Sequence, residues 1–565
     1  MGDDIAGTTE HPWLKSYPEG VEWGRIIEPK PLHTILDDAA AKFGDRVCAD
    51  FMDKTFTYRQ IADLVNRTVK GLQAHGVKKG SRVGLFLPNS PYFVIFYYAV
   101  LKAGGTVVNF NPLYAEKEIA HQITDSGVEI MVTLDLKALY DKIGHMLAKT
   151  DLRRIIVCRM TGILPFPKNL LFPIAKRKEV ARIPSDDRHV WFHDLARNDG
   201  AFSPVAVTAD DLGVLQYTGG TTGVPKGAML SHANLYANTV QAVRWFKEAQ
   251  PGQETMLGVL PFFHVFAMTA VMNLSIYLGA TILMLPRFEI GTVMKTIDRK
   301  KPTLFPAVPT IYTAINNHKE RDKYDLASIK FCISGGAPLP IEVKQDFEKL
   351  TGCRLVEGYG LSECSPVATC NPVAGKNKTG SIGLPLPGTT IEIVSLDEPR
   401  RVLGLNERGE VCVRGPQVML GYWNKPEETA RTLVDGRLHT GDVGYLDDEG
   451  YTFIVDRIKD LILAGGYNIY PRNVEEAIYQ HPAVAECVVA GVPDQYRGQT
   501  VKAYIKLKEG QPLDADGLKA FLKDHLSAIE MPKQVEFRDE LPKTMIGKLS
   551  RKALLEEEAA KAAGR

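Results

Sequence analysis

The segment Tyr217–Gly227, YTGGTTGVPKG, contains four glycines, three threonines, one proline and a single lysine. A run with so few large side chains cannot build a hydrophobic core, so we expect a loop that surrounds a ligand. Glycines let backbone N–H groups approach an anion closely, threonine hydroxyls add hydrogen-bond donors, and a lysine adds a positive charge suited to phosphate. The composition therefore indicates a phosphate-binding loop.

The loop does not match the phosphate-binding motif of P-loop NTPases, G-x-x-x-x-G-K-[ST]. Gly227 follows Lys226, where that motif requires serine or threonine. No helix opens directly on the loop, because GAML precedes Ser231, the predicted start of a helix. The alternative is a glycine-rich hairpin with solvated threonines, but a run of this length and composition favours phosphate binding.

Length and composition describe an ordinary globular protein. A chain of 565 residues exceeds what one hydrophobic core usually supports, so at least two domains are expected. The net charge of +1 argues against a nucleic-acid partner held by bulk electrostatics. The eight cysteines are scattered without a C-x-x-C pair, which predicts reduced, buried thiols in a cytoplasmic protein and no disulfide framework or zinc site.

The segment from Thr255 to Pro286 contains no charged residue and is long enough to resemble a membrane span. Pro261, His264 and Gly279 interrupt it, however. We therefore predict a buried helix near Val265–Leu278 and a strand near Thr281–Leu285.

Strands and helices alternate along most of the chain. Arg82–Pro88 and Thr106–Pro112 are predicted strands, and Ser90–Gly105 between them is a predicted helix with Ser90 as its N-cap. Thr303–Ala307 is a further predicted strand. Repeated units of this kind imply parallel sheets covered by helices. After about Asp456 the pattern changes to a compact α+β unit, so we place a domain boundary at Arg457–Lys459, giving domains 1–457 and 458–565.

The loop resembles the signature of the adenylate-forming superfamily, which contains acyl-CoA synthetases, luciferases and peptide-synthetase adenylation domains. Other motifs of that superfamily follow in the expected order over roughly residues 30 to 555. They are LPFFHVFA (Leu260–Ala267), SGGAPLP (Ser334–Pro340), EGYGLSECSP (Glu357–Pro366), HTGDVGYLDDEGYTFIVDRIKDLI (His439–Ile462), GGYNIYPRNVEE (Gly465–Glu476) and PKTMIGKLSRK (Pro542–Lys552). Within the superfamily, the chain is most similar to bacterial fatty-acyl-CoA synthetases.

The resemblance implies a large α/β N-terminal domain with βαβ-type parallel sheets and a small distorted β-barrel, followed by a small mobile α+β domain. It also implies an ATP-dependent fatty acid–CoA ligase. A medium- or long-chain acid would be activated as acyl-AMP with release of pyrophosphate, and its acyl group would then pass to CoA with release of AMP. Mg²⁺ would be the cofactor, with ATP and CoA as co-substrates.

Two other functions were weighed. An adenylating CoA ligase for another acid, such as a dicarboxylic or aryl acid, stays open, because the sequence does not fix the shape of the acyl tunnel expected around Met268, Val308 and Gly336. A non-catalytic binder of fatty acids or nucleotides is disfavoured, because the polar residues that the resemblance assigns to catalysis and binding are present. They are Lys226, Glu363, Asp442, Arg457 and Lys548.

The resemblance assigns a set of residues to the nucleotide and the metal. The phosphate contacts fall to Thr218, Gly219, Gly220, Thr221, Thr222, Gly223 and Lys226, with Glu363 as the Mg²⁺ ligand and the Ser362 hydroxyl on the α-phosphate. Tyr359 would stack on adenine, Asp442 would accept hydrogen bonds from both ribose hydroxyls, and Arg457 would orient the ribose. Gly336 and Gly360 complete the predicted nucleotide site. Taken alone, Glu363 is equally typical of a solvated helix face, Tyr359 of a core residue and Arg457 of a surface ion pair.

Four further residues are assigned to catalysis and to CoA. Lys548 would bridge the attacking carboxylate and the α-phosphate, although a basic tail around it would give the same local sequence. His264 would border the acyl carboxylate, although a histidine between apolar residues is often a core residue. Lys459 would be the hinge of the small domain, and the glycines Gly465 and Gly466 would let the CoA thiol pass close to the backbone.

The segment Ile163–Pro184 begins with apolar residues and continues with basic ones. It contains five basic residues and one acidic residue, Glu179. This pattern suits contact with an anionic membrane surface, and it is equally typical of an exposed loop. The protein would then be cytoplasmic, with peripheral contact to the cytoplasmic face of the membrane. The expected partners are a fatty or dicarboxylic acid, ATP and CoA, without nucleic acid, and the resemblance adds a homodimer.

Overall fold

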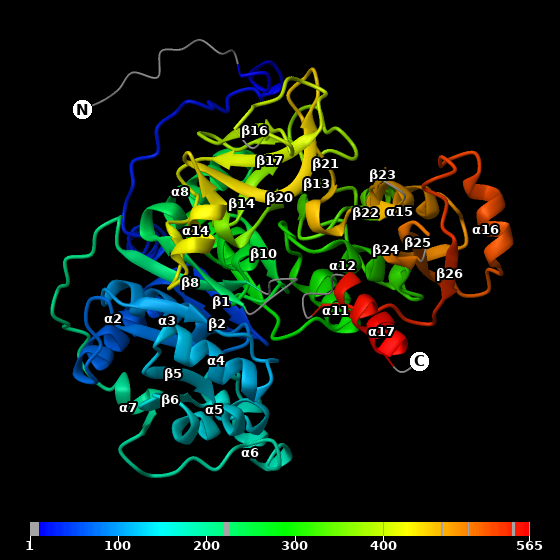
Figure 1. Ribbon diagram of the computed structural model, residues 1–565. Coiled ribbons are helices and arrows are strands. Elements are labelled where there is room, and N and C mark those ends of the chain that lie inside the picture. Colours follow the sequence, from blue (N-terminus) through cyan, green and yellow to red (C-terminus); the bar gives the residue numbers. More distant parts are fainter. Residues whose placement is uncertain are drawn as a thin grey trace.

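The computed structural model describes residues 11–218, 225–398, 400–464, 467–494, 496–544 and 549–563 (Figure 1). Over these residues the strands form five sheets. Four of them belong to the large part of the molecule, and the fifth belongs to the C-terminal part, which lies to one side of it.

The largest sheet has the strand order β18-β9-β8-β4-β3-β5-β6-β7. Its strands are β3 (Arg82–Leu85), β4 (Thr106–Asn109), β5 (Ile130–Leu134), β6 (Arg154–Cys158), β7 (His189–Trp191), β8 (Leu212–Thr218), β9 (Lys226–Ser231) and β18 (Gly421–Tyr422). Neighbours from β7 to β8 are parallel, whereas β9 and β18 are antiparallel to the strands beside them. The predicted βαβ organisation is therefore confirmed.

Helices cover this sheet as its βαβ connections require. They include α2 (Tyr58–Ala74), α3 (Pro91–Lys102), α4 (Glu116–Ser126), α5 (Lys137–Lys149) and α8 (His232–Trp245). Ser231 caps α8, because its Oγ accepts from the Asn234 N–H at 3.1 Å while Asn234 Oδ1 accepts from the Ser231 N–H at 3.0 Å. The helix start predicted at Ser231 is therefore confirmed, and a strand lies between the glycine-rich loop and this helix.

Two smaller sheets pack beside the first. One has the order β10-β11-β1-β2, with β1 (Val47–Phe51), β2 (Lys54–Thr57), β10 (Thr255–Gly258) and β11 (Thr281–Met284). The other has the order β12-β13-β14-β15, with β12 (Phe331–Ser334), β13 (Arg354–Gly360), β14 (Val367–Cys370) and β15 (Leu384–Pro385). The strand expected at Thr303–Ala307 forms only isolated bridges, because Pro302 and Pro306 supply no N–H donor to a ladder.

The uncharged segment is buried inside the protein. It forms α9 (Val265–Ala267), the π-helical stretch η3 (Met268–Asn273) and α10 (Leu274–Leu278), and then enters β11. The helix and strand predicted there are confirmed, with a π-helical middle that the sequence did not indicate. Among the described residues, no helix has the length and apolar character needed to cross a bilayer.

The fourth sheet is antiparallel and corresponds to the predicted barrel-like part. It contains β16 (Thr390–Val394), β17 (Gly409–Arg414), β19 (Leu433–Val434), β20 (Arg437–Leu446) and β21 (Thr452–Arg457). After β21, the short 3₁₀ helix η6 (Ile458–Asp460) leads into the C-terminal part.

The C-terminal part has its own sheet and its own core. The sheet contains β22 (Ile462–Ala464), β23 (Tyr467–Ile469), β24 (Val484–Asp494), β25 (Gly498–Leu507) and β26 (Gln534–Phe537), accompanied by α15 (Pro471–Tyr479), α16 (Ala515–Leu522) and α17 (Arg551–Ala563). Buried residues of the large hydrophobic cluster come from Trp13–Tyr451, and those of the two small clusters come from Ile462–Leu554. The predicted fold class, a large α/β part and a small α+β part, is confirmed.

Candidate active site

The predicted phosphate-binding loop joins the ends of the β8–β9 hairpin. Thr218 pairs with Lys226 across the hairpin, and its Oγ1 donates to the Lys226 carbonyl at 3.4 Å. Gly219, Gly220, Thr221, Thr222 and Gly223 lie outside the described residues, as do Gly465, Gly466 and Lys548. The hairpin therefore fixes where the loop begins and ends.

Lys226 is held by two partners that the sequence did not predict. Its Nζ lies 2.8 Å from Glu428 Oε2 on α14 (Pro426–Thr432) and 4.7 Å from the centre of the Tyr422 ring. The lysine, in turn, holds the pKa of Glu428 below its usual range. Because α14 is remote in sequence, only the folded chain shows that Lys226 pairs with the Glu428 carboxylate.

Tyr422 also contacts the predicted metal ligand. Its hydroxyl donates to Glu363 Oε1 at 2.7 Å, and burial raises the pKa of this tyrosine. Glu363 and Ser362 lie in the short 3₁₀ helix η5 (Ser362–Cys364). One buried tyrosine thus connects Lys226 with Glu363, through the pairing of β18 with β9.

Asp442 is the centre of a second polar group. It is 4% exposed, its Oδ1 lies 2.9 Å from Arg457 Nε, and its Oδ2 accepts from the Tyr359 hydroxyl at 2.5 Å. Asp442 is the main cause of a raised pKa at Arg457, and burial raises the pKa of Tyr359. Three residues that the sequence assigned separately to the nucleoside are therefore in direct contact.

The remaining predicted nucleotide residues lie at one edge of the β12–β13 pair. The two strands are parallel, Gly336 follows β12, and Gly360 is the last residue of β13. A Cβ at Gly360 would lie 2.2 Å from the Pro366 carbonyl oxygen, so close packing requires glycine there. The carboxyl ends of parallel strands are a common place for ligands in α/β proteins.

His264 is the N-cap of α9, and its Nδ1 accepts from the Phe266 N–H at 3.3 Å. His264 is partly exposed, whereas the next residue, Val265, is buried. The histidine therefore lies at the surface of the buried helical segment and is not enclosed in the core.

A small apolar cavity of about 30 Å³ lies between α8, the η3–α10 segment and strands of both smaller sheets. It is lined by Ala242, Trp245, Phe246, Ala249, Met256, Ala270, Leu274, Leu304, Pro306, Phe331, Cys332, Ile333, Val367, Cys370 and Leu386, none of them charged. The sequence placed the acyl tunnel around Met268, Val308 and Gly336, but none of these lines the cavity. Met268 is fully buried, and its sulfur accepts from Asn109 Nδ2 at 3.3 Å.

The segment around Lys459 connects the two parts of the protein. Lys459 lies in η6, and burial lowers its pKa. Before it, Asp456 Oδ2 accepts from the Arg472 N–H at 2.8 Å, at the start of α15. After it, Asp460 Oδ2 lies 2.8 Å from Arg551 Nη1 on α17. The connecting segment is therefore tied to the C-terminal part on both sides of Lys459.

Two buried carboxyl groups at this junction titrate at unusual pH. Burial raises the pKa of Asp456 to about 6 against the opposing effect of Arg551. Burial likewise raises the pKa of Glu357, on β13, to about 7, although Arg472 of the C-terminal part lowers it in turn. The charge of the surface between the two parts therefore changes near neutral pH.

Comparison with protein families matches two regions of the chain. The family described as AMP-binding enzyme matches residues 36–423, and the AMP-binding enzyme C-terminal domain matches residues 473–548. A long-chain-fatty-acid–CoA ligase of Bacillus subtilis is 49% identical over 556 residues, which cover 97% of this chain and 98% of the relative. A protein of the same name from Salmonella typhimurium is 37% identical over 558 residues, covering 96% and 98%.

Solved structures of similar proteins share the fold over nearly their whole length. ATP-bound MatB from Rhodopseudomonas palustris has a TM-score of 0.81 at 28% identity, covering 93% of this chain and 98% of that structure. The anthranilate CoA ligase AuaEII in complex with anthranoyl-AMP has a TM-score of 0.84 at 25% identity, covering 95% and 99%. With the glycine-rich hairpin, the Asp442 group and these matches, the chain belongs to the AMP-binding enzyme family.

Proposed function

We propose that this protein is an ATP-dependent fatty acid–CoA ligase, which forms an acyl-AMP with release of pyrophosphate and then an acyl-CoA with release of AMP. The observation that carries the proposal is the similarity to long-chain-fatty-acid–CoA ligases over nearly the full length of both chains. An acyl site that receives a hydrocarbon chain would disfavour a dicarboxylic acid, because a second carboxylate buried there would have no charged partner.

The triphosphate would bind at the β8–β9 hairpin. Thr218 and Lys226, with the glycines and threonines between them, would donate to the β and γ phosphates, and Lys226 would exchange Glu428 for phosphate. Glu363 and Ser362, both in η5, lie near this position, because Tyr422 contacts both Glu363 and Lys226. A single carboxylate next to a phosphate site suits Mg²⁺, which prefers carboxylate, phosphate and water oxygens. When bound, the ion would neutralise charge on the leaving pyrophosphate.

The nucleoside would bind at Asp442. Both oxygens of this carboxylate are fixed by Arg457 and Tyr359, and a carboxylate has enough lone pairs to accept from two ribose hydroxyls as well. The Tyr359 ring would stack on adenine, and Gly336 and Gly360 would let the nucleotide approach the edge of the β12–β13 pair. His264 would border the acyl carboxylate.

A carboxylate is a poor acyl donor, because it has no good leaving group. The first half-reaction therefore converts it to an acyl-AMP, in which AMP is the leaving group. Positioning and preorganised charge supply most of the rate in such a step, since the protein forms no covalent bond. Lys548 would bridge the attacking carboxylate and the α-phosphate, where negative charge accumulates in the transition state. Deprotonated CoA sulfur then attacks the activated carbonyl and displaces AMP.

The two half-reactions would use different orientations of the C-terminal part. We place the domain boundary between Arg457 and Ile458, so that residues 1–457 and 458–565 rotate about Lys459. The separate hydrophobic clusters of the two parts support this division. Rotation would withdraw Lys548 and bring Gly465 and Gly466 toward the acyl carbonyl.

Pyrophosphate release in the presence of CoA, measured with acids of increasing length, tests the substrate. Saturated monocarboxylic acids of medium and long chain are expected to support release. Dicarboxylic acids of similar size should support at least tenfold less, as one unpaired buried charge would require. Matched reactions without CoA separate adenylation from thioester formation. Equal use of dicarboxylic acids, or no release with any fatty acid, would contradict the proposal.

We also propose peripheral contact with an anionic membrane through α6 (Lys168–Ala175) and its flanks (Figure 1). No residue of α6 is buried, and Phe166, Leu170, Leu171 and Ile174 are between 56% and 79% exposed. Basic residues follow directly. Lys176 pairs with Glu179 at 2.6 Å, whereas Arg177, Lys178 and Arg182 are exposed. Apolar side chains beside cations suit a surface of anionic lipid, where fatty acids also partition.

Flotation with vesicles of phosphatidylglycerol and of phosphatidylcholine tests this contact. The protein is expected to float with the anionic vesicles. A variant that combines Arg177→Gln, Lys178→Gln and Arg182→Gln should lose most of this binding, because each cation contributes about 1 kcal/mol to the binding free energy. The matched control neutralises three exposed cations elsewhere, Arg197→Gln, Lys319→Gln and Arg400→Gln together, and should float like the unaltered protein. Equal flotation of the triple variant would refute the proposal.

A further inference from the structure

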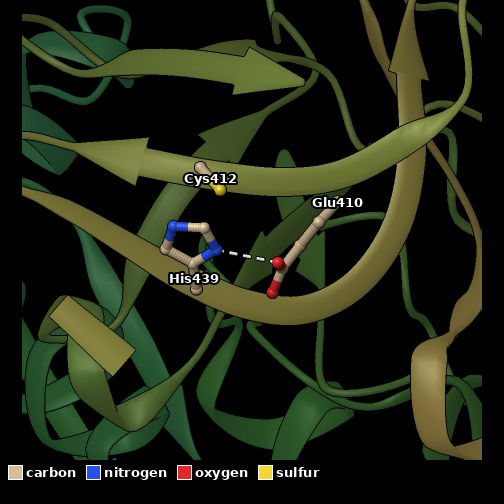
Figure 2. A group of neighbouring side chains, drawn as sticks. All are labelled: Glu410, Cys412 and His439. Carbon is tan, nitrogen blue, oxygen red and sulfur yellow. Dashed lines mark hydrogen bonds and ion pairs between the residues drawn. The ribbon is translucent and has the colours of Figure 1, made fainter. Parts of the chain in front are cut away.

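Glu410, Cys412 and His439 form a polar group on neighbouring strands β17 and β20 (Figure 2). The Nδ1 of His439 lies 2.8 Å from Glu410 Oε2, and the His439 side chain is only 10% exposed. A carboxylate only accepts hydrogen bonds, so Nδ1 carries the proton of this contact. The other oxygen, Glu410 Oε1, accepts from the Gly441 N–H at 2.8 Å.

These contacts surround an irregularity in the strand pairing. Glu410 pairs with Val443 and Cys412 with His439, so the single residue Val411 on β17 faces Thr440–Asp442 on β20. Gly441 has a φ of +73°, a left-handed conformation that favours glycine. Bulges of this kind redirect a side chain, and here the redirected residue is Asp442.

Four side-chain contacts hold the bulge in place. Thr440 Oγ1 donates to the Val411 carbonyl at 2.7 Å and accepts from the Asp442 N–H at 3.1 Å. Glu410 supplies the other two, because its carboxylate accepts from both the Gly441 N–H and the His439 ring. The backbone on either side of Thr440 is therefore anchored to β17 directly before Asp442.

We infer that Glu410, oriented together with His439, is a positioning residue that holds the bulge of β20 so that Asp442 faces the ribose. This inference rests on the proposed role of Asp442 in nucleotide binding. Glu410 acts on the position of Asp442 through its hydrogen bonds to the Gly441 N–H and the His439 side chain.

A metal site is the competing explanation of the same group, because ligand atoms of Glu410, Cys412 and His439 all lie within 4.8 Å of one another. Two observations disfavour it. Both Glu410 oxygens already accept hydrogen bonds, and burial, with the nearby Glu410 charge, raises the pKa of the Cys412 thiol, which opposes formation of the thiolate ligand. The positioning role requires no thiol, so the two explanations predict different results for Cys412→Ser.

The experiment compares ATP with 2′-deoxy-ATP in pyrophosphate release by the full chain. The unaltered protein should prefer ATP, because a ribose hydroxyl donates to Asp442. Glu410→Ala is expected to lower kcat/KM for ATP about tenfold, mainly through KM. The loss with 2′-deoxy-ATP should be smaller, because this nucleotide keeps only the 3′-hydroxyl contact to Asp442, so the preference for ATP shrinks. Glu410→Gln keeps one acceptor for the Gly441 N–H, so its kcat/KM for ATP should lie between those of the unaltered protein and Glu410→Ala. This variant also tests the inference if Glu410→Ala does not fold.

Two controls complete the design. Glu392→Ala removes a carboxylate of the same sheet that pairs with Arg414 at 3.2 Å, and it should leave the nucleotide preference unchanged. Cys412→Ser should also behave like the unaltered protein. Equal losses with both nucleotides in Glu410→Ala and Glu410→Gln would overturn the positioning role, and a loss in Cys412→Ser matching that of Glu410→Ala would replace it with a metal site.

The design also separates this inference from the proposed function. If the unaltered protein and Asp442→Asn use both nucleotides equally well, the ribose role of Asp442 is wrong and the positioning role falls with it. If the unaltered protein prefers ATP and Glu410→Ala keeps that preference in full, only the role of Glu410 is wrong.

Discussion

Lys548→Ala is expected to lower the rate of acyl-adenylate formation by roughly 10²–10³-fold while leaving thioester formation from supplied acyl-AMP and CoA nearly unchanged. The lysine is predicted to stabilise the charge that develops between the attacking carboxylate and the α-phosphate. This transition state belongs to the first half-reaction only, so conversion of acyl-AMP to acyl-CoA should not need the lysine. Pyrophosphate release measures the first step, and acyl-CoA formation from synthetic acyl-AMP measures the second.

Lys543→Ala is the matched control for this substitution. Lys543 lies in the same basic segment, but its Nζ pairs with Glu486 at 2.6 Å in the C-terminal part. Its loss should cost little in either half-reaction, as a surface ion pair contributes little. Equal loss of both half-reactions in Lys548→Ala, or an equal effect of Lys543→Ala, would show that Lys548 is only one of several cations in a basic tail.

Lys459→Pro is expected to spare adenylation and to slow thioester formation by about 10²-fold. Proline fixes φ near −65°, so a residue that must change its backbone angles between two orientations is locked in one of them. Misplacement of a reacting group by about 1 Å already costs about that factor. Single-turnover measurements of acyl-AMP formation and of its conversion to acyl-CoA separate the two steps.

Lys459→Ala keeps both backbone angles free and removes only the side chain. Retained thioester formation in this variant, with loss in Lys459→Pro, would assign the effect to the backbone. Normal thioester formation in Lys459→Pro would show that the two parts do not rotate about this residue. Loss of both half-reactions with a lowered melting temperature would mean that η6 is a structural element and not a hinge.

Much of the fold was predictable because its signals are local. The short apolar strands, the helix that starts after Ser231 and the alternation from Arg82 onward depend on spacing and capping within a few residues. The strand expected at Thr303–Ala307 failed for a local reason that could have been noticed, since Pro302 and Pro306 both remove ladder donors. The π-helical stretch Met268–Asn273 had no such signal, because its apolar residues fit an α-helix equally well.

The candidate site was predictable in its residue types and less so in its contacts. The sequence selected Asp442, Arg457 and Tyr359, and the structure brings the three together. It gave no indication of Glu428, which pairs with Lys226 across 202 residues of the chain, or of Tyr422, which donates to Glu363 across 59 residues.

The amino-acid order by itself determined most of the strands and helices, because these depend on neighbouring residues. It also determined which loop has the glycines and the lysine that suit phosphate. Only the tertiary structure decided which side chains meet. The bulge next to Asp442 exists because the register between β17 and β20 shifts there. Glu410, on β17, can stabilise the bulge only by a hydrogen bond to Gly441 on the neighbouring strand. The energy of such contacts depends on distance in space, which the spacing of residues along a chain does not fix.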